Sequence, residues 1–155
     1  TVVRRSTLRR MRREQVPVRL DALANWLRDE QDADHVAAIL EALEGYPVDQ
    51  TQPLLIETIA SGARDQDNRV AALRLFEQGL IPDTEGRLVD LAKRVEEGPV
   101  LAVVLEMIGN RPQIAGNQLL LESLSSESAA VRIAALRASG PMTVRSDWAR
   151  TPGAA

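Results

Sequence analysis

The chain contains no cysteine, and this absence removes several kinds of chemistry at once. Without thiols it can form no disulfide bond, no thiolate metal site and no covalent haem attachment. Proteins of reducing and of oxidising compartments can both lack cysteine, so the sequence does not indicate a localisation.

Long apolar runs and aromatic residues are also scarce. No run approaches the roughly 18 apolar residues of a membrane-spanning helix, so we expect no membrane span. Aromatic residues make up 3% of the chain and hydrophobic residues 45%, so Leu, Val, Ile and Ala must form the core. The first residues, 1–5, include neither an initiator Met nor a signal-like segment. We therefore expect the chain to be a piece of a longer protein.

Residues suited to catalysis are few. His35 is the only histidine, and no second His or Cys could join it in a metal site. The nucleophile motif G-x-S-x-G and the glycine-rich phosphate loops are absent. The acidic pairs at 29–30 and 96–97 fall at predicted helix ends, where solvated charges are typical. We expect a solvated His35, no cofactor, no metal and no enzymatic activity.

Five prolines divide the chain at nearly equal intervals. They lie 30, 35, 30 and 29 residues apart, at Pro17, Pro47, Pro82, Pro112 and Pro141. A period of about 20–50 residues is typical of stacked supersecondary units. Apolar residues between the prolines recur with helical spacing, and strand-like alternation is absent. This predicts an all-α fold with first helices at 2–14, 34–45, 67–79, 99–109 and 128–139, and second helices at 18–30, 51–63, 84–97 and 115–125.

Glycines, prolines and capping residues mark the predicted helix ends. Glycine accepts the left-handed conformation that often ends a helix, which we predict at Gly45, Gly79, Gly109 and Gly140. Pro53 and Pro99 fit the first helical turn, where a missing N–H is tolerated. Short side chains that cap exposed N–H groups are expected at Asp67, Asp83 and Ser128.

Three first helices share a local motif. Residues 131–137 (VRIAALR) align with 68–74 (NRVAALR) and with 3–9 (VRRSTLR). This motif resembles HEAT repeats, especially the short bacterial type related to phycobilin-lyase repeats. The copies at 34–45 and 99–109 lack the arginine and are assigned by spacing.

The resemblance implies a right-handed α-solenoid of about 4.5 helix pairs over residues 1–140. Its repeats are expected at 1–31, 32–65, 66–97, 98–126 and, in part, 127–140. Residues 141–155 are expected to form an irregular or disordered tail.

The resemblance also implies a structural role for the aligned Arg4, Arg69 and Arg132. In such repeats this arginine packs between layers and pairs with an acidic residue of an adjacent repeat. The sequence leaves four candidate partners open, namely Asp32, Asp34, Asp65 and Asp67.

A HEAT-like chain without catalytic motifs is expected to be a non-catalytic scaffold. Its partner would be another protein or a neighbouring domain of a larger bacterial multidomain protein, and its oligomeric state is open. Second helices would line the concave face, with Arg19, Trp26 and Arg28 as candidate contacts and exposed Gln52, Glu57, Arg87 and Asp90 beside them. Trp26 can equally fill the core, since Trp suits both binding hot spots and layer packing.

An arginine stripe suggests the alternative of nucleic-acid binding. Arg5, Arg9 and Arg12 share one helical side and could neutralise phosphates, with strongly salt-dependent affinity. The stripe can also be the solvated outer face of one repeat. Net charge is −3, and no aromatic residue interleaves the stripe for base stacking. The pattern therefore favours a protein partner over nucleic acid.

Overall fold

The described part of the chain is entirely helical in its regular structure. The computed structural model describes residue 10 and residues 19–140. Within these residues the helices are α2 (Leu20–Asp29), α3 (Ala33–Leu43), α4 (Val48–Ala60), α5 (Gln66–Gln78), the 3₁₀ turn η1 (Pro82–Thr84), α6 (Arg87–Ala92), α7 (Pro99–Gly109), α8 (Asn117–Ser123) and α9 (Ala129–Ala138). The predicted all-α class is confirmed. None of these helices has the length and apolar character needed to cross a bilayer.

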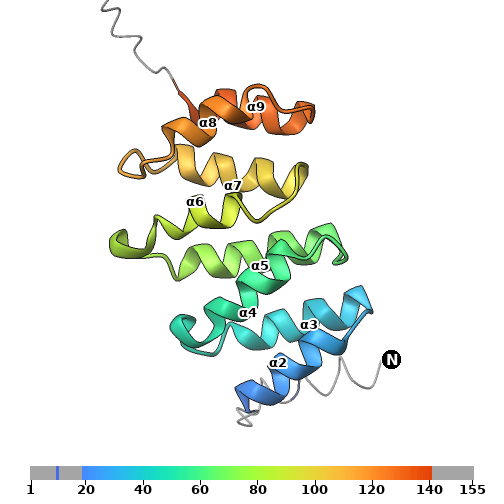
Figure 1. Ribbon diagram of the computed structural model, residues 1–155. Helices are drawn as coiled ribbons and strands as arrows, with labels where there is room; N and C mark the ends of the chain where they lie inside the picture. The colour runs from blue at the N-terminus through green and yellow to red at the C-terminus, as the bar shows by residue number, and fades with distance from the viewer. Residues whose placement is uncertain (1–9, 11–18, 141–155) are drawn as a thin grey trace, which may run out of the picture.

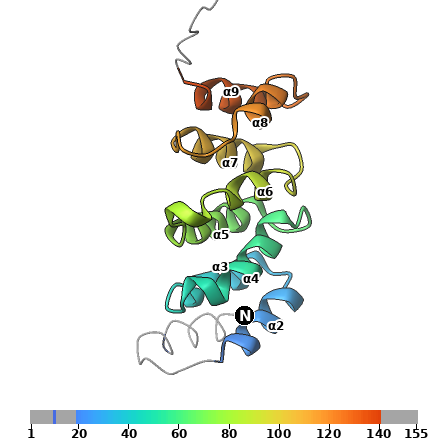
Figure 2. The ribbon, with the colours of Figure 1, turned by 60° about the vertical axis from the view of Figure 1, so that its left-hand side comes forward.

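The helices follow one another along a stack (Figures 1 and 2). Four of them, here called the first row, touch one another in succession: α3, α5, α7 and α9. The second row consists of α2, α4, α6 and α8. Each second-row helix packs on the first-row helix that follows it, and second-row helices make few contacts with one another. The first row is therefore continuous, while the surface between second-row helices is open.

Aliphatic side chains form the core, as the composition predicted. Leu23, Ile39, Leu73 and Leu105 are each fully buried at 0% exposure, and Phe76 joins them as a large aromatic. Burying one such side chain contributes about 1.5–3 kcal/mol. The helices are thus held together by many similar small contributions along the stack.

The predicted caps are partly confirmed. Ser128 caps α9, where its hydroxyl accepts a bond from the Val131 N–H at 3.5 Å. The predicted N-cap at Asp67 was wrong. Asp65 caps α5 instead, and its side chain accepts hydrogen bonds from the backbone N–H groups of Asp67 and Asn68 at 2.9 and 3.3 Å. Asp67 instead lies in the first turn of α5, where its negative charge interacts favourably with the positive end of the helix dipole.

Of three predicted helix starts, one is confirmed and two are wrong. Pro99 opens α7 as predicted. Pro53 lies inside α4, because that helix already begins beyond Pro47, whose carbonyl accepts its first N–H bonds. The second helix predicted at 84–97 is shorter and starts later, since η1 precedes it and α6 covers Arg87–Ala92. Asp83 is therefore not its N-cap, a position that Gly86 takes.

Two of the predicted helix-end glycines, Gly79 and Gly109, lie at close contacts between helices. Among the four expected in the left-handed conformation, Gly140 has a positive φ of 56°, and the prediction was wrong for Gly45, Gly79 and Gly109. A Cβ added at Gly79 would lie 1.8 Å from Val48 Cγ1, and one at Gly109 would lie 2.3 Å from the Cα of Ala138. The missing side chain lets two helix ends meet, a reason that a local sequence pattern cannot reveal.

Candidate functional site: the groove between α4 and α6

A groove of 690 Å³ separates α4 from α6. The groove exists because α4 packs on α5 and α6 packs on α7, while α4 and α6 make few contacts with each other. The α4 wall carries Asp49, Gln52, Pro53, Ile56 and Glu57. The opposite wall carries Arg87, Asp90, Leu91 and Arg94, from α6 and the residues directly after it.

The groove combines an apolar floor with a charged rim. Leu91 is buried and Ile56 half-buried, while the charged side chains of the lining are exposed. Glu57 pairs with Arg28 at 3.2 Å. The other four charged side chains make no ion pair and no side-chain hydrogen bond within residues 19–140; they are Asp49, Arg87, Asp90 and Arg94. They can therefore meet charges of a partner without first breaking bonds inside the chain.

Gln52 is the unusual polar residue of this groove. The sequence predicted it exposed, yet only 5% of its surface is accessible. Buried Thr51 and Thr58 donate to carbonyls one turn earlier in α4, whereas the Gln52 amide makes no hydrogen bond with any described residue. Fully enclosed side-chain N and O atoms in this part of the chain all have partners, so the Gln52 amide keeps access to the groove. It offers one carbonyl acceptor and two N–H donors.

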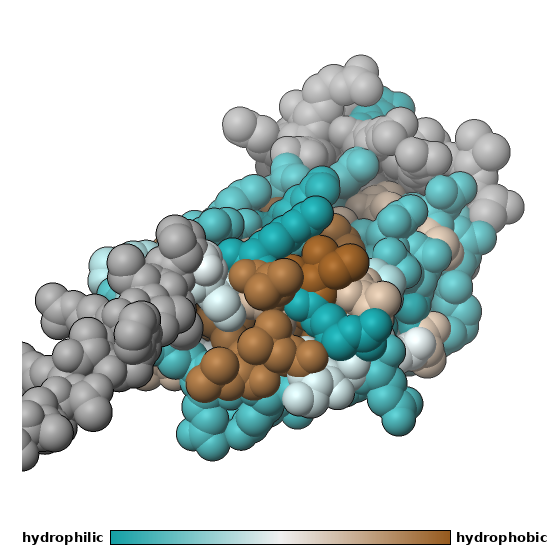
Figure 3. All heavy atoms as spheres, turned by 90° about the horizontal axis from the view of Figure 1, so that it is seen from above, coloured by the Kyte–Doolittle hydropathy of each residue, from teal (hydrophilic) through white to brown (hydrophobic). Residues whose placement is uncertain are grey.

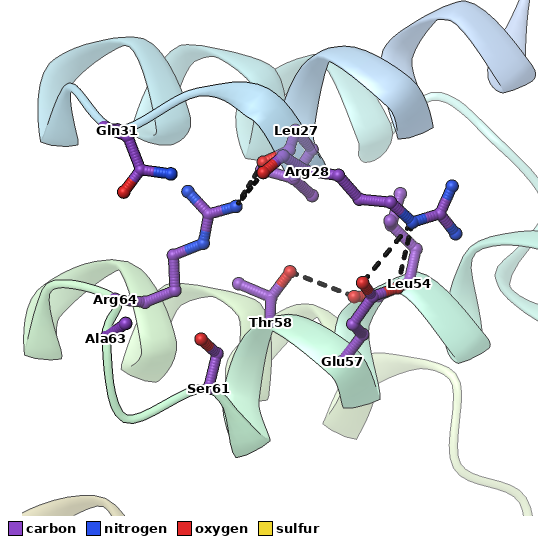
Figure 4. Close-up of a pocket in the computed structure, with 9 residues that line it drawn as sticks. All are labelled: Leu27, Arg28, Gln31, Leu54, Glu57, Thr58, Ser61, Ala63 and Arg64. Atoms are coloured by element: carbon purple, nitrogen blue, oxygen red, sulfur yellow. Dashed lines mark hydrogen bonds and ion pairs between the residues drawn. The ribbon is translucent and has the colours of Figure 1, made fainter.

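A smaller pocket between α2 and α4 differs from the groove because its polar groups bond to one another (Figure 4). Its volume is 210 Å³. Arg64 reaches across it and donates to the carbonyls of Leu27 and Glu30, and to that of Arg28 at 3.1 Å. These bonds satisfy carbonyls in the last turn of α2, as basic residues near helix ends commonly do. This pocket is therefore part of the stack's own packing, and the α4–α6 groove is the better candidate for a ligand.

None of the three predicted contacts on and beside α2 lines that groove. Arg19 is exposed and pairs with Asp21 at 2.7 Å. Arg28 contacts Glu57, which lines both hollows. Trp26 is half-buried, packs against the core and donates its indole N–H to Glu30 at 3.3 Å. The predicted Arg4, Arg5, Arg9 and Arg12 lie outside the described residues.

His35 is buried, which corrects the expectation of a solvated side chain. It is 6% exposed, and its Nδ1 lies 3.2 Å from a carboxylate oxygen of Glu30. The other Glu30 oxygen accepts the backbone N–H groups of Gln31 and Asp32, each at 3.1 Å. Chiefly the Asp32 N–H, and further the Gln31 and Trp26 N–H groups, lower the pKa of Glu30. The position of His35 at the start of a helix was predicted from the sequence, but the carboxylate that folds over it was not.

Arg69 bonds to α4 and to an acidic residue of its own predicted repeat, 66–97, and not to an acidic residue of an adjacent repeat. Its side chain is buried and its Nε donates to the Ile59 carbonyl of α4 at 2.8 Å. Its Nη2 contacts one carboxylate oxygen of Glu96 at 2.8 Å, and Nη1 contacts the other. These bonds lower the pKa of Glu96. None of the four aspartates named from the sequence is its partner.

Arg132 departs from its predicted role. It is exposed and donates to the carbonyls of Ser126 and Glu127, at 2.7 and 2.8 Å. It makes no ion pair with the described acidic residues. The aligned arginines thus share a motif but not an environment, because further helices follow α5 whereas α9 is the last described one.

Several residues of the groove and of the packing between helices are not among those predicted from the sequence. Asp49 and Arg94 complete the groove, and a helical stripe would have found them, since 49, 52 and 56 follow i, i+3, i+7, as do 87, 90 and 94. Arg111 was also missed, although it joins Glu77 at 2.8 Å and the Met107 carbonyl at 2.9 Å. No local signal identifies such a bond between distant segments.

No protein-family model, curated protein or solved structure matches this chain.

Proposed function

We propose that the chain is a right-handed α-solenoid of HEAT-like helix pairs that serves as a non-catalytic interaction module. Its ligand is an extended segment of another protein, or of a neighbouring domain of the same polypeptide, bound in the α4–α6 groove. The alternation of a continuous first row with a spaced second row supports this assignment. In such an architecture each repeat adds contact surface along one face.

The amide of Gln52 carries the proposal, because it opens to the groove and makes no hydrogen bond with any described residue. A ligand can therefore pair with this amide without breaking a bond inside the chain. An amide that faces a groove can pair with one peptide group of an extended chain, which also offers one donor and one acceptor. The surrounding side chains then set the specificity. Asp49 and Asp90 suit basic residues of the segment, while Arg87 and Arg94 suit acidic ones.

The groove lining is poor in groups that could act as catalysts. It contains no His, Ser or Thr, and its carboxylates lie on an exposed rim. A general acid or base is commonly poised by burial or by a close charged neighbour. The lining instead offers apolar area, charge of both signs and one amide, which are the components of a binding surface.

Peptide selection tests this proposal. The full chain is immobilised and used to enrich a displayed library of random peptides of about 12 residues, and enriched peptides are measured by calorimetry. We expect the charge-reversed double variant Asp49→Lys, Asp90→Lys to change the Kd of selected peptides at least about 10-fold. Gln52→Ala should weaken every selected peptide, because the amide contacts backbone.

Arg74→Glu provides the matched control, since Arg74 is an exposed charge on the first-row helix α5. Its binding should equal that of the unmodified chain. Failure to enrich any peptide, or equal binding by all variants, would contradict the proposal. Circular dichroism of each variant verifies that helix content is retained.

A further inference from the structure

The α8–α9 end of the stack presents large apolar side chains to solvent. Leu136 and Ile133 of α9 are 66% and 51% exposed, and Leu121 of α8 is 55% exposed. Figure 3, a view from this end, shows apolar side chains gathered at the centre of the surface. Soluble proteins rarely leave such a cluster open unless it serves an interaction.

A comparison within the chain shows what this surface is suited to bind. The motif of α9 also occurs in α5, where Leu73 occupies the place of Leu136 and Arg69 that of Arg132. Leu73 is completely buried and Arg69 is 5% exposed. The next first-row helix, α7, packs on α5, whereas no described helix follows α9 in this row. The exposed face of α9 therefore carries the residues that elsewhere receive another first-row helix.

We infer that a second copy of the chain covers this face, with the two α9 helices in contact across a two-fold axis. First-row helices already pack on one another at every junction, from α3 to α5, α5 to α7 and α7 to α9. A contact between two α9 helices continues this row. It also closes the assembly, since both copies use the same surface.

The charges around the patch are self-complementary, which favours a second copy over an unrelated apolar partner. Arg132 and Arg137 are exposed on α9, where Arg137 also pairs with Glu106 at 3.5 Å. Glu122 and Glu127 are exposed on α8 and on the segment between the two helices. A two-fold axis can place these basic side chains of one copy against the acidic side chains of its partner. Charge complementarity of this kind fixes orientation and disfavours wrong partners.

Sedimentation equilibrium of the full chain tests the inference directly. We expect a concentration-dependent rise from 17.0 kDa to twice that mass. Leu136→Glu should raise the dimer dissociation constant at least about 10-fold, because it places an unpaired carboxylate in the apolar centre. Ile81→Glu is the matched control. Ile81 is 57% exposed but lies beside η1, away from this face, so its variant should dimerise normally.

The absence of cysteine allows a second test that does not depend on affinity. Ile133→Cys gives a chain with one thiol, which a short bis-maleimide should link to the thiol of the second copy. Ile81→Cys should remain uncoupled under the same conditions. Both reactions are followed by denaturing electrophoresis.

Two results would overturn the inference. One is a monomer at all concentrations up to several hundred micromolar, which would mean that residues 141–155 or a different partner covers α9. The other is a dimer that Leu136→Glu leaves unchanged, which would place the contact elsewhere. The outcome does not depend on the α4–α6 groove, because the variants leave its lining intact.

Discussion

Arg69 and Glu96 are joined by two side-chain bonds across 27 residues of sequence. The same guanidinium donates to the Ile59 carbonyl, so one buried side chain connects α4 with the segment that follows α6. Helix α4 forms one wall of the groove, and α6 with the residues directly after it forms the other. Arg69 thus ties the last turn of α4 to the segment that follows α6, and so links the two sides of the proposed binding site.

Removing Arg69 should therefore destabilise the fold. We expect Arg69→Ala to lower the free energy of unfolding by about 1–3 kcal/mol, because the Ile59 carbonyl loses its side-chain donor and Glu96 loses its ion pair. Glu96→Ala should cost less, since the Glu96 side chain is 52% exposed. Urea denaturation measures both effects. Arg132→Ala, at the aligned but exposed arginine, should change stability by less than about 0.5 kcal/mol. An equal effect of Arg69→Ala and Arg132→Ala would contradict this role.

Stability should fall as the medium becomes acidic. The pKa values of Glu30 and Glu96 lie below their usual 4.5, chiefly through the Asp32 N–H and the Arg69 guanidinium respectively. A carboxylate with a lowered pKa in the folded state stabilises the protein above its unfolded pKa, and this contribution is lost as pH falls through the folded pKa. The urea midpoint should therefore decrease from about pH 5 downward.

The variants Glu30→Gln and Glu96→Gln identify the groups responsible. Each should be less stable than the unmodified chain near neutral pH and should show a flatter dependence on pH below about 5. Glu127→Gln, at an exposed position, controls for the change in net charge. An unchanged pH slope in both test variants would refute the assignment.

Glycine substitutions should show whether close packing or backbone conformation selects these residues. Gly109→Ala should destabilise the fold by about 1–3 kcal/mol, because its Cβ would meet the backbone of Ala138 at 2.3 Å. Gly79→Ala meets the side chain of Val48, so the added change Val48→Ala should recover part of the loss.

Gly86→Ala is the control for that series. Its φ is −56° and no atom lies within 4 Å of an added Cβ, so alanine fits without strain. The substitution should be neutral or stabilise by up to about 1 kcal/mol, because it restricts the unfolded chain. Thermal unfolding of the variants should order them with Gly86→Ala highest. An equal loss of stability in Gly79→Ala, Gly109→Ala and Gly86→Ala would contradict the steric explanation.

Binding to duplex DNA should be weak or absent at near-physiological salt. The net charge is −3, and the groove rim carries charges of both signs. The triple variant Arg5→Ala, Arg9→Ala, Arg12→Ala should therefore behave like the unmodified chain in a fluorescence-anisotropy titration with duplex DNA. Tight binding that falls steeply with salt and disappears in the triple variant would instead support the nucleic-acid alternative.

Local sequence signals predicted the helices where start and stop residues are strong. The predicted helix at 99–109 coincides with α7, and Pro99 opens it, although Gly109 lacks the left-handed conformation that was predicted to end it. The prediction at 84–97 failed at both ends, because η1 occupies its start and α6 ends at Ala92. Apolar spacing shows that a segment is helical, but the packing of its neighbours decides how long the helix is.

The candidate site was predictable only in part. Glu57, Arg87 and Asp90 were expected on the open face and do line the groove. Gln52 was expected there too, but its burial depends on side chains of more than one helix. The partner of Arg69 could not be chosen, because four aspartates and Glu96 are all compatible with its charge, and the choice is made by which loop reaches it in space.

The helical character of this protein follows from its amino-acid order, since the 3.6-residue spacing of its aliphatic side chains and its regular proline interruptions are local properties of the chain. Which of those helices touch depends on how the chain folds in space. The tertiary structure left a gap between α4 and α6, buried Gln52 and His35, selected Glu96 for Arg69, and covered Leu73 while leaving Leu136 exposed. The reason is physical: helix formation depends on residues three or four apart, whereas burial and pairing depend on segments about 30 residues apart.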